Sequence, residues 1–153
     1  MSLEETDEDE LSPEELASSL KALPLIKLVF AGSIVVYIAL SIYIKYGLFE
    51  GEPRGFVYNM TDPVMQILFY IFCVAALLAF AAQFYVPVLM RGRDSSVLGQ
   101  LQANMSRIFL CELIAMLGLI YFFLGGDLLK GLPFMLFALL ALLFGDRQAQ
   151  KAL

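Results

Sequence analysis

Four long apolar runs limit what this chain can fold into more than any other feature. Hydrophobic residues make up 60% of its 153 positions, and the charged residues, 16%, gather between the apolar runs. About 20 consecutive apolar residues suffice for a helix that crosses a bilayer. In hydrocarbon a backbone must satisfy its own hydrogen bonds, which a helix does. We therefore predict an all-α integral membrane protein, a four-helix bundle made of two hairpins.

Charged and turn-forming residues mark the ends of the predicted spans. Lys27 and Lys45 bracket the first apolar run, Asp62-Pro63 is typical of a helix start, and Gly-Gly-Asp at 125–127 predicts a tight turn. Whether the fourth run crosses the bilayer completely is left open. The predicted transmembrane domain covers residues 24–153, with spans at approximately 25–46, 63–90, 105–124 and 128–145.

The amino-terminal segment differs from the rest of the chain in charge. Eight of the fifteen acidic residues lie in the first fifteen positions, so residues 1–11 are predicted to be a disordered acidic tail. Ser-Pro-Glu-Glu at 12–15 is a helix start signal. Leu16, Leu20 and Leu23 follow at helical spacing. We therefore predict a short interfacial helix at 12–23 that lies on the membrane surface before Pro24.

The distribution of basic residues predicts the orientation. With four spans, one side of the membrane holds seven of them and the other side holds Lys45, Arg54 and Lys130. The positive-inside rule then places both termini in the cytoplasm, and we expect a bacterial inner membrane. The seven include the predicted membrane-interface anchors, which are Lys21, Lys27, Arg91, Arg93 and Arg107; the other two are Arg147 and Lys151.

One acid, Glu112, lies inside the third apolar run, five residues after Arg107. It is therefore about 7 to 8 Å deeper along the helix. A carboxyl group at that depth must be protonated, paired with another helix, or exposed to an aqueous path. Gln83, Ser33 and Tyr37 are its possible interhelical partners. Three readings stay open, because the carboxyl group can be an interhelical lock, a binding group for a proton or cation, or a contact to another subunit or to lipid.

Nothing in the sequence predicts catalysis, and we expect no enzyme activity. The chain has no histidine, which is the commonest general base and zinc ligand. Cys73 and Cys111 fall inside apolar runs, where small buried thiols are more common than disulfides or metal sites. We therefore predict no catalytic site, no metal site and no cofactor, and no nucleic acid partner.

The stretch Glu112-Leu-Ile-Ala-Met-Leu-Gly118-Leu119-Ile120 resembles the carboxylate-bearing helix of the ATP synthase c subunit (proteolipid) family. That resemblance implies that Glu112 binds a transported proton or sodium ion. The chain is also similar to uncharacterised bacterial four-span membrane proteins with an Arg-x4-Glu-x5-Gly-Leu third helix. Four-span proteolipids carry their essential acid on the last helix, whereas the fourth apolar run here has none.

Three functions follow from these observations. The first is a non-catalytic accessory or scaffold subunit of a larger membrane complex, because the loops are short and no catalytic group stands out. The second is a c-like proteolipid that binds or translocates protons or cations through Glu112. The third is a small transporter or pore. The expected partners are the lipid bilayer and other membrane proteins or further copies of this chain.

Overall fold

The computed structural model describes residues 13–52, 54–59, 61–93 and 97–144, and nearly all of them are helical. The predicted all-α class is confirmed for these residues, whose one strand-like pairing is an isolated bridge between Arg54 and Asn59. The predicted acidic tail at 1–11 lies outside the described residues. The elements are α1 (Pro13–Tyr43), the π-helix η1 (Ile44–Leu48), α2 (Pro63–Arg93), α3 (Val97–Gly125) and α4 (Leu128–Phe144).

Three of the helices are long and apolar enough to cross a membrane. The qualifying stretches are Lys21–Leu48, Pro63–Tyr85 and Leu101–Gly125. The fourth helix, α4, is apolar but shorter, with 17 residues. These lengths and compositions are compatible with integration into a membrane.

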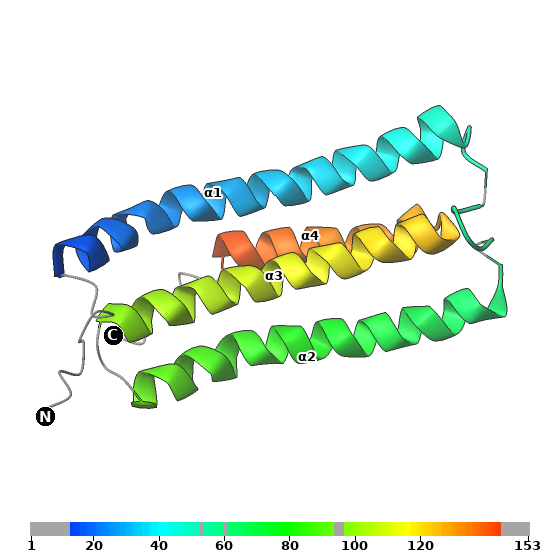
Figure 1. Cartoon of the computed structure of the whole chain (residues 1–153). Coiled ribbons are helices and arrows are strands. Elements are labelled where there is room, and N and C mark those ends of the chain that lie inside the picture. The colour runs from blue at the N-terminus through cyan, green and yellow to red at the C-terminus, as the bar shows by residue number, and fades with distance from the viewer. Residues whose placement is uncertain (1–12, 53, 60, 94–96, 145–153) are drawn as a thin grey trace, which may run out of the picture.

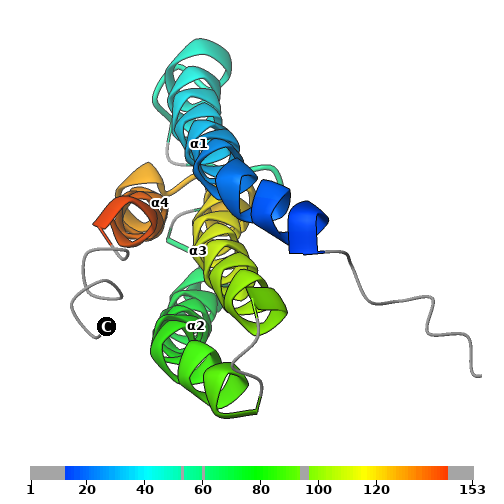
Figure 2. The same cartoon turned by 90° about the vertical axis from the view of Figure 1, so that its left-hand side faces the viewer.

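Helix α3 is the centre of the bundle. It packs against α1, α2 and α4, and α4 also packs against α1. Figure 2 shows α1 and α2 on opposite sides of α3, with α4 on a third side. The predicted two-hairpin arrangement is therefore wrong for its first pair, because α1 and α2 do not pack as a hairpin. Their connection, between Leu48 and Pro63, is long enough to pass over the end of α3.

Small side chains let the helices approach one another closely. The core contains Ala31, Ala76, Ala79, Ala115 and Ala138 among larger residues. Such residues are typical of helix interfaces in membranes, where close backbone packing replaces the hydrophobic effect. Helices α3 and α4 approach closely at Gly118 and Gly131, where a Cβ atom on either residue would overlap the backbone of the other.

Helix α4 runs antiparallel to α3 (Figure 1). Gly118 of α3 faces Gly131 of α4. Met105 precedes Gly118 in α3 by as many residues as Phe144 follows Gly131 in α4. The last turn of α4 therefore lies near the level of Met105 and Arg107 on α3, so α4 runs beside most of the apolar part of its neighbour.

Helix α1 continues without a break through Pro24. Residues 13–23 of the segment predicted as an interfacial helix at 12–23 form the amino-terminal part of α1, without a break before Tyr43; the position of this segment on the membrane surface stays a prediction. A proline inside a helix removes one backbone hydrogen bond and introduces a kink. Prolines of this kind are tolerated within long apolar helices, where neighbouring groups satisfy the freed carbonyl oxygen.

Candidate functional site

Glu112 lies on the side of α3 that faces α1, where two hydroxyl groups meet it. The Ser33 hydroxyl is 2.9 Å from Oε1 of Glu112, and the Tyr37 hydroxyl donates to the same oxygen at 2.7 Å. Ser33 and Tyr37 are four residues apart, so they project from one face of α1. Two of the three partners suggested by the sequence are therefore in hydrogen-bonding contact with Glu112.

Some of the other polar atoms near Glu112 have hydrogen-bond partners and others have none among the described residues. Ser33 Oγ is also 2.8 Å from the carbonyl oxygen of Phe30, one turn earlier in α1. The second carboxyl oxygen, Oε2 of Glu112, is buried and has no hydrogen-bond partner among the described residues. Ser41, one turn beyond Tyr37, is also fully buried, and its hydroxyl has no partner in that part of the chain.

Gln83 is not part of this cluster. Its side chain is buried on α2, with 5% exposure, and its Nε2 has no partner among the described residues. It lies next to Cys111. Cys111 and Glu112 are about 100° apart around α3, because a helix turns once in 3.6 residues. Gln83 therefore approaches the flank of α3 that carries Cys111, while α1 covers the flank that carries Glu112.

The structure describes the side chains of three of the five predicted membrane-interface anchors. Lys21 is exposed near the start of α1, whereas Lys27 and Arg107 are partly buried and both lie near Cys111. The side chains of Arg91 and Arg93 lie outside the described residues, although both positions belong to α2. Lys27 and Arg107 are therefore close to the same level of the bundle, at one end of the Glu112 cluster.

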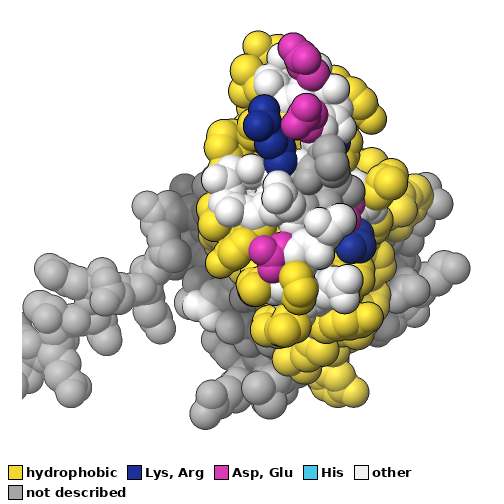
Figure 3. Space-filling view, turned by 90° about the vertical axis from the view of Figure 1, so that its right-hand side faces the viewer, with side chains coloured by type: hydrophobic (Ala, Val, Ile, Leu, Met, Phe, Trp, Pro, Cys, Tyr) yellow, Lys and Arg dark blue, Asp and Glu magenta, His cyan; other side chains and the backbone are white. Residues whose placement is uncertain are grey.

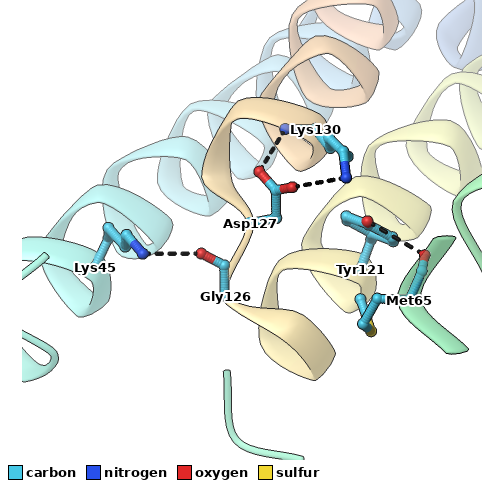
Figure 4. A network of polar contacts seen from close by, with 6 residues as sticks. All are labelled: Lys45, Met65, Tyr121, Gly126, Asp127 and Lys130. Atoms are coloured by element: carbon cyan, nitrogen blue, oxygen red, sulfur yellow. Dashed lines mark hydrogen bonds and ion pairs between the residues drawn. The ribbon is translucent and has the colours of Figure 1, made fainter. Parts of the chain in front are cut away.

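Sequence reasoning missed a second polar cluster, at the end of the bundle where η1 and the α3–α4 turn meet (Figure 4). Lys45 was predicted to flank the membrane, but it is buried, with 8% exposure. Its ammonium group donates to the carbonyl oxygens of Glu52 and Gly126, the latter at 3.2 Å. The lysine thereby connects η1 to both the α1–α2 loop and the α3–α4 turn.

The α1–α2 loop covers the carboxyl end of α3. The amide of Phe56 donates to the carbonyl oxygen of Phe123 at 2.8 Å, and the amide of Tyr58 donates to that of Leu124 at 2.8 Å. The last carbonyl groups of a helix have no partner within the helix, and here the loop supplies one. In the sequence, the glycines at 55, 125 and 126 are the feature that indicates this close contact between the loop and the turn. A side chain at Gly55 would overlap the backbone of the α3–α4 turn.

The start of α4 completes this polar end. Asp127 accepts a hydrogen bond from the amide of Lys130 at 3.2 Å and forms an ion pair with the Lys130 ammonium group at 3.2 Å. Lys130 also lies over the ring of Phe69, and Tyr121 donates to the carbonyl oxygen of Met65 at 3.3 Å. Figure 3 shows charged and other polar groups gathered at this end beside a hydrophobic surface.

The two clusters differ in the chemistry they offer. The first presents one carboxyl group to two hydroxyl groups, an arrangement that can hold a proton or join two helices. The second consists of backbone carbonyl groups capped by a lysine. Within the described part of the chain, no group of three or more His, Cys, Asp or Glu side chains is placed to hold a metal ion. No family model, curated protein or solved structure matches this chain.

Proposed function

We propose that this chain is an integral membrane protein that acts as a non-catalytic accessory or scaffold subunit of a larger membrane complex. The observation that supports this proposal is an uncovered side of α3, the central helix. Three sides of α3 are occupied by α1, α2 and α4 (Figure 2). The fourth side is available to a transmembrane helix of another protein.

The uncovered side is a continuous apolar stripe. Its four side chains, Phe109, Leu113, Met116 and Ile120, are between 41% and 55% exposed. They recur at helical spacing, so they form one line along α3. The stripe contains no charged residue. Packing between helices in a bilayer depends on van der Waals contact and shape, and we expect a partner helix to bind along this line.

Glu112 has a structural role in this proposal. Its hydrogen bonds with Ser33 and Tyr37 tie α1 to α3 beside the stripe. Hydrogen bonds between helices in a membrane contribute about 0.6 kcal/mol on average. The pair of bonds therefore holds α1 in position and keeps the stripe uncovered by this chain's own helices.

Site-specific photocrosslinking in the native membrane tests the proposal. A photoreactive residue at Leu113 is expected to join the chain to one partner protein. Leu78 is the matched control, since it is 67% exposed on α2 and lies between Ala76 and Ala79, which are buried. Native mass spectrometry of the gently extracted protein then gives the stoichiometry. Lipid adducts alone at both positions would contradict the proposal.

A second candidate function is a c-like proteolipid that binds or translocates protons or cations through Glu112. It is supported by two hydroxyl groups that converge on one carboxyl oxygen. This candidate predicts a homo-oligomer, so crosslinking from Leu113 into a second copy would favour it. In reconstituted vesicles, Glu112→Gln is expected to abolish ion flux while the protein stays folded. Flux that persists in this variant would exclude the second candidate.

A further inference from the structure

We infer that residues 55–58 of the α1–α2 loop insert into the lipid bilayer at one end of the bundle, where Phe56 and Val57 contact acyl chains close to the headgroups. The partner of this surface is lipid, and the contact anchors the loop in the membrane. The inference rests on the proposed integration of the long apolar helices into a membrane. It depends neither on the accessory role nor on ion binding at Glu112.

Hydrogen bonds place this segment at the level of the last turn of α3. The amide of Phe56 donates to the carbonyl oxygen of Phe123 at 2.8 Å, and the amides of the two residues that follow donate to that of Leu124 at 3.2 and 2.8 Å. The stretch of α3 that is long and apolar enough to cross a membrane ends one residue later, at Gly125. The segment therefore lies beside the end of a candidate span.

A second set of contacts gives the same level from the side of α1. Lys45 of η1 donates to the carbonyl oxygen of Gly126 at 3.2 Å and also to that of Glu52 in the loop. The whole of η1 belongs to another candidate span, Lys21–Leu48. The ends of two candidate spans and the loop between α1 and α2 thus meet at one depth.

At this depth the loop exposes large apolar side chains. Phe56 is 60% exposed, Val57 is 62% exposed, and Leu48 at the end of η1 is 57% exposed. The ring of Phe56 is held in place by the rings of Phe49 and Phe123, with centroid distances of 5.1 and 5.8 Å. A bilayer that surrounds the bundle reaches the end of each span, so exposed apolar side chains at this level meet lipid.

The surface of α1 and η1 beside the loop supports lipid as the occupant. Tyr43 is 63% exposed and Tyr46 is 64% exposed. Tyrosine is enriched at both surfaces of a membrane, where its ring contacts lipid and its hydroxyl group reaches the headgroups. This end of the bundle therefore has the composition of a membrane interface, and Phe56 joins it through its contact with Phe49.

The loop also has a charged side. Glu52 and Arg54 form an ion pair at 3.7 Å with both side chains exposed, and the Arg54 guanidinium group lies 5.6 Å from the centre of the Phe49 ring. In Figure 3 charged and other polar groups form a band through the middle of this end, bordered by hydrophobic side chains. Segments with one apolar and one charged side lie at the boundary between lipid and water, as amphipathic helices do.

The backbone of the segment suits an environment of low polarity. All four of its amides have acceptors, because Gly55 donates to the carbonyl oxygen of Tyr58 at 2.9 Å and the next three amides donate to the last turn of α3. Irregular backbone at membrane depth is tolerated where the protein itself satisfies its polar groups. These bonds satisfy the loop amides and the helix end together, without any need for water.

Fluorescence quenching in vesicles tests the inference. The chain contains no tryptophan, so an introduced one is the sole tryptophan. The variant Phe56→Trp is reconstituted in phosphatidylcholine vesicles whose acyl chains carry bromine either close to the headgroup or close to the chain end. We expect a blue-shifted emission that is quenched more by bromine close to the headgroup than by bromine at the chain end, and only weakly by acrylamide in the water.

Two exposed positions are matched controls. Tyr70 is 68% exposed and lies seven residues after Pro63, about 10 Å deeper along α2. Tyr70→Trp should therefore respond more than Phe56→Trp to bromine at the chain end. Glu52→Trp, on the charged side of the loop, should be quenched most by acrylamide. If acrylamide quenches Phe56→Trp and neither brominated lipid does, the inference is overturned.

Photolabelling of the unaltered protein removes the dependence on variants that fold. Lipids with a diazirine on the acyl chain close to the headgroup should label residues 55–58 as well as Leu48 and Val64, which are exposed at the neighbouring helix ends. Label at both helix ends without label at 55–58 would overturn the inference. An absence of label at all of these positions would refute the membrane placement and the inference with it. Because the vesicles contain no partner protein, these outcomes are independent of crosslinking from Leu113.

Discussion

Gly118 of α3 and Gly131 of α4 meet with no room for a side chain on either. A Cβ atom added to Gly118 would lie 2.6 Å from the carbonyl oxygen of Gly131, and one added to Gly131 would lie 2.8 Å from that of Gly118. Atoms at these distances overlap, and the obstructing atoms belong to the backbone. The approach of α3 and α4 therefore depends on glycine at both positions.

Replacement of Gly118 by valine is expected to destabilise the fold. The branched side chain would push α4 away from α3, and overpacking of a core costs about 1 to 3 kcal/mol. Gly32→Ala is the control, since a Cβ atom at Gly32 has nothing within 4 Å. The free energy of unfolding in mixed detergent micelles measures both. Equal effects of the two substitutions would contradict the proposed backbone contact.

The α1–α2 loop is expected to loosen when Lys45 is replaced by methionine. The substitution keeps much of the apolar length but leaves the carbonyl oxygens of Glu52 and Gly126 without their donor. Loss of hydrogen bonds to a buried charged group costs about 1.5 to 3 kcal/mol. Hydrogen exchange of the Phe56 and Tyr58 amides reports the change.

Lys21→Met is the matched control for that experiment, because Lys21 is exposed near the start of α1. It removes the same charge far from the loop. If the loop amides of Lys45→Met exchange as slowly as those of the control, the lysine does not hold the loop in place.

The bond between Tyr37 and Glu112 is expected to stabilise the α1–α3 interface measurably. Tyr37→Phe removes the hydroxyl group and should cost about 0.5 to 1.5 kcal/mol. Tyr85→Phe removes a hydroxyl group from a side chain that is exposed on α2 and should be close to neutral. A double-mutant cycle with Glu112→Leu gives the interaction free energy between the two side chains. If the two substitutions change the free energy of unfolding additively, the residues are not coupled.

The orientation predicted from the basic residues is open to chemical labelling. In a variant without Cys73 and Cys111, a cysteine at Glu50 is expected to react with a membrane-impermeant maleimide added to intact cells. A cysteine at Ser2 should react only after the membrane is permeabilised, because seven basic residues favour a cytoplasmic location for that side. The reverse pattern would contradict the predicted orientation.

The sequence was sufficient to predict the four apolar helices and part of the Glu112 cluster. Apolar runs of this length form helices, and Pro63 and the Gly-Gly-Asp turn at 125–127 mark helix ends in the structure as predicted. Ser33 and Tyr37 were identifiable because their spacing places them on one helical face at the depth of Glu112. Local geometry within one helix was enough for these conclusions.

Only the tertiary structure decided which helices are neighbours. Apolar side chains face both lipid and other helices, so hydropathy does not distinguish the two environments. For this reason the sequence did not show that α3 separates α1 from α2, or that Gln83 approaches Cys111 instead of Glu112. The role of Lys45 depends on carbonyl groups from residues far apart in the chain, which only folding brings together.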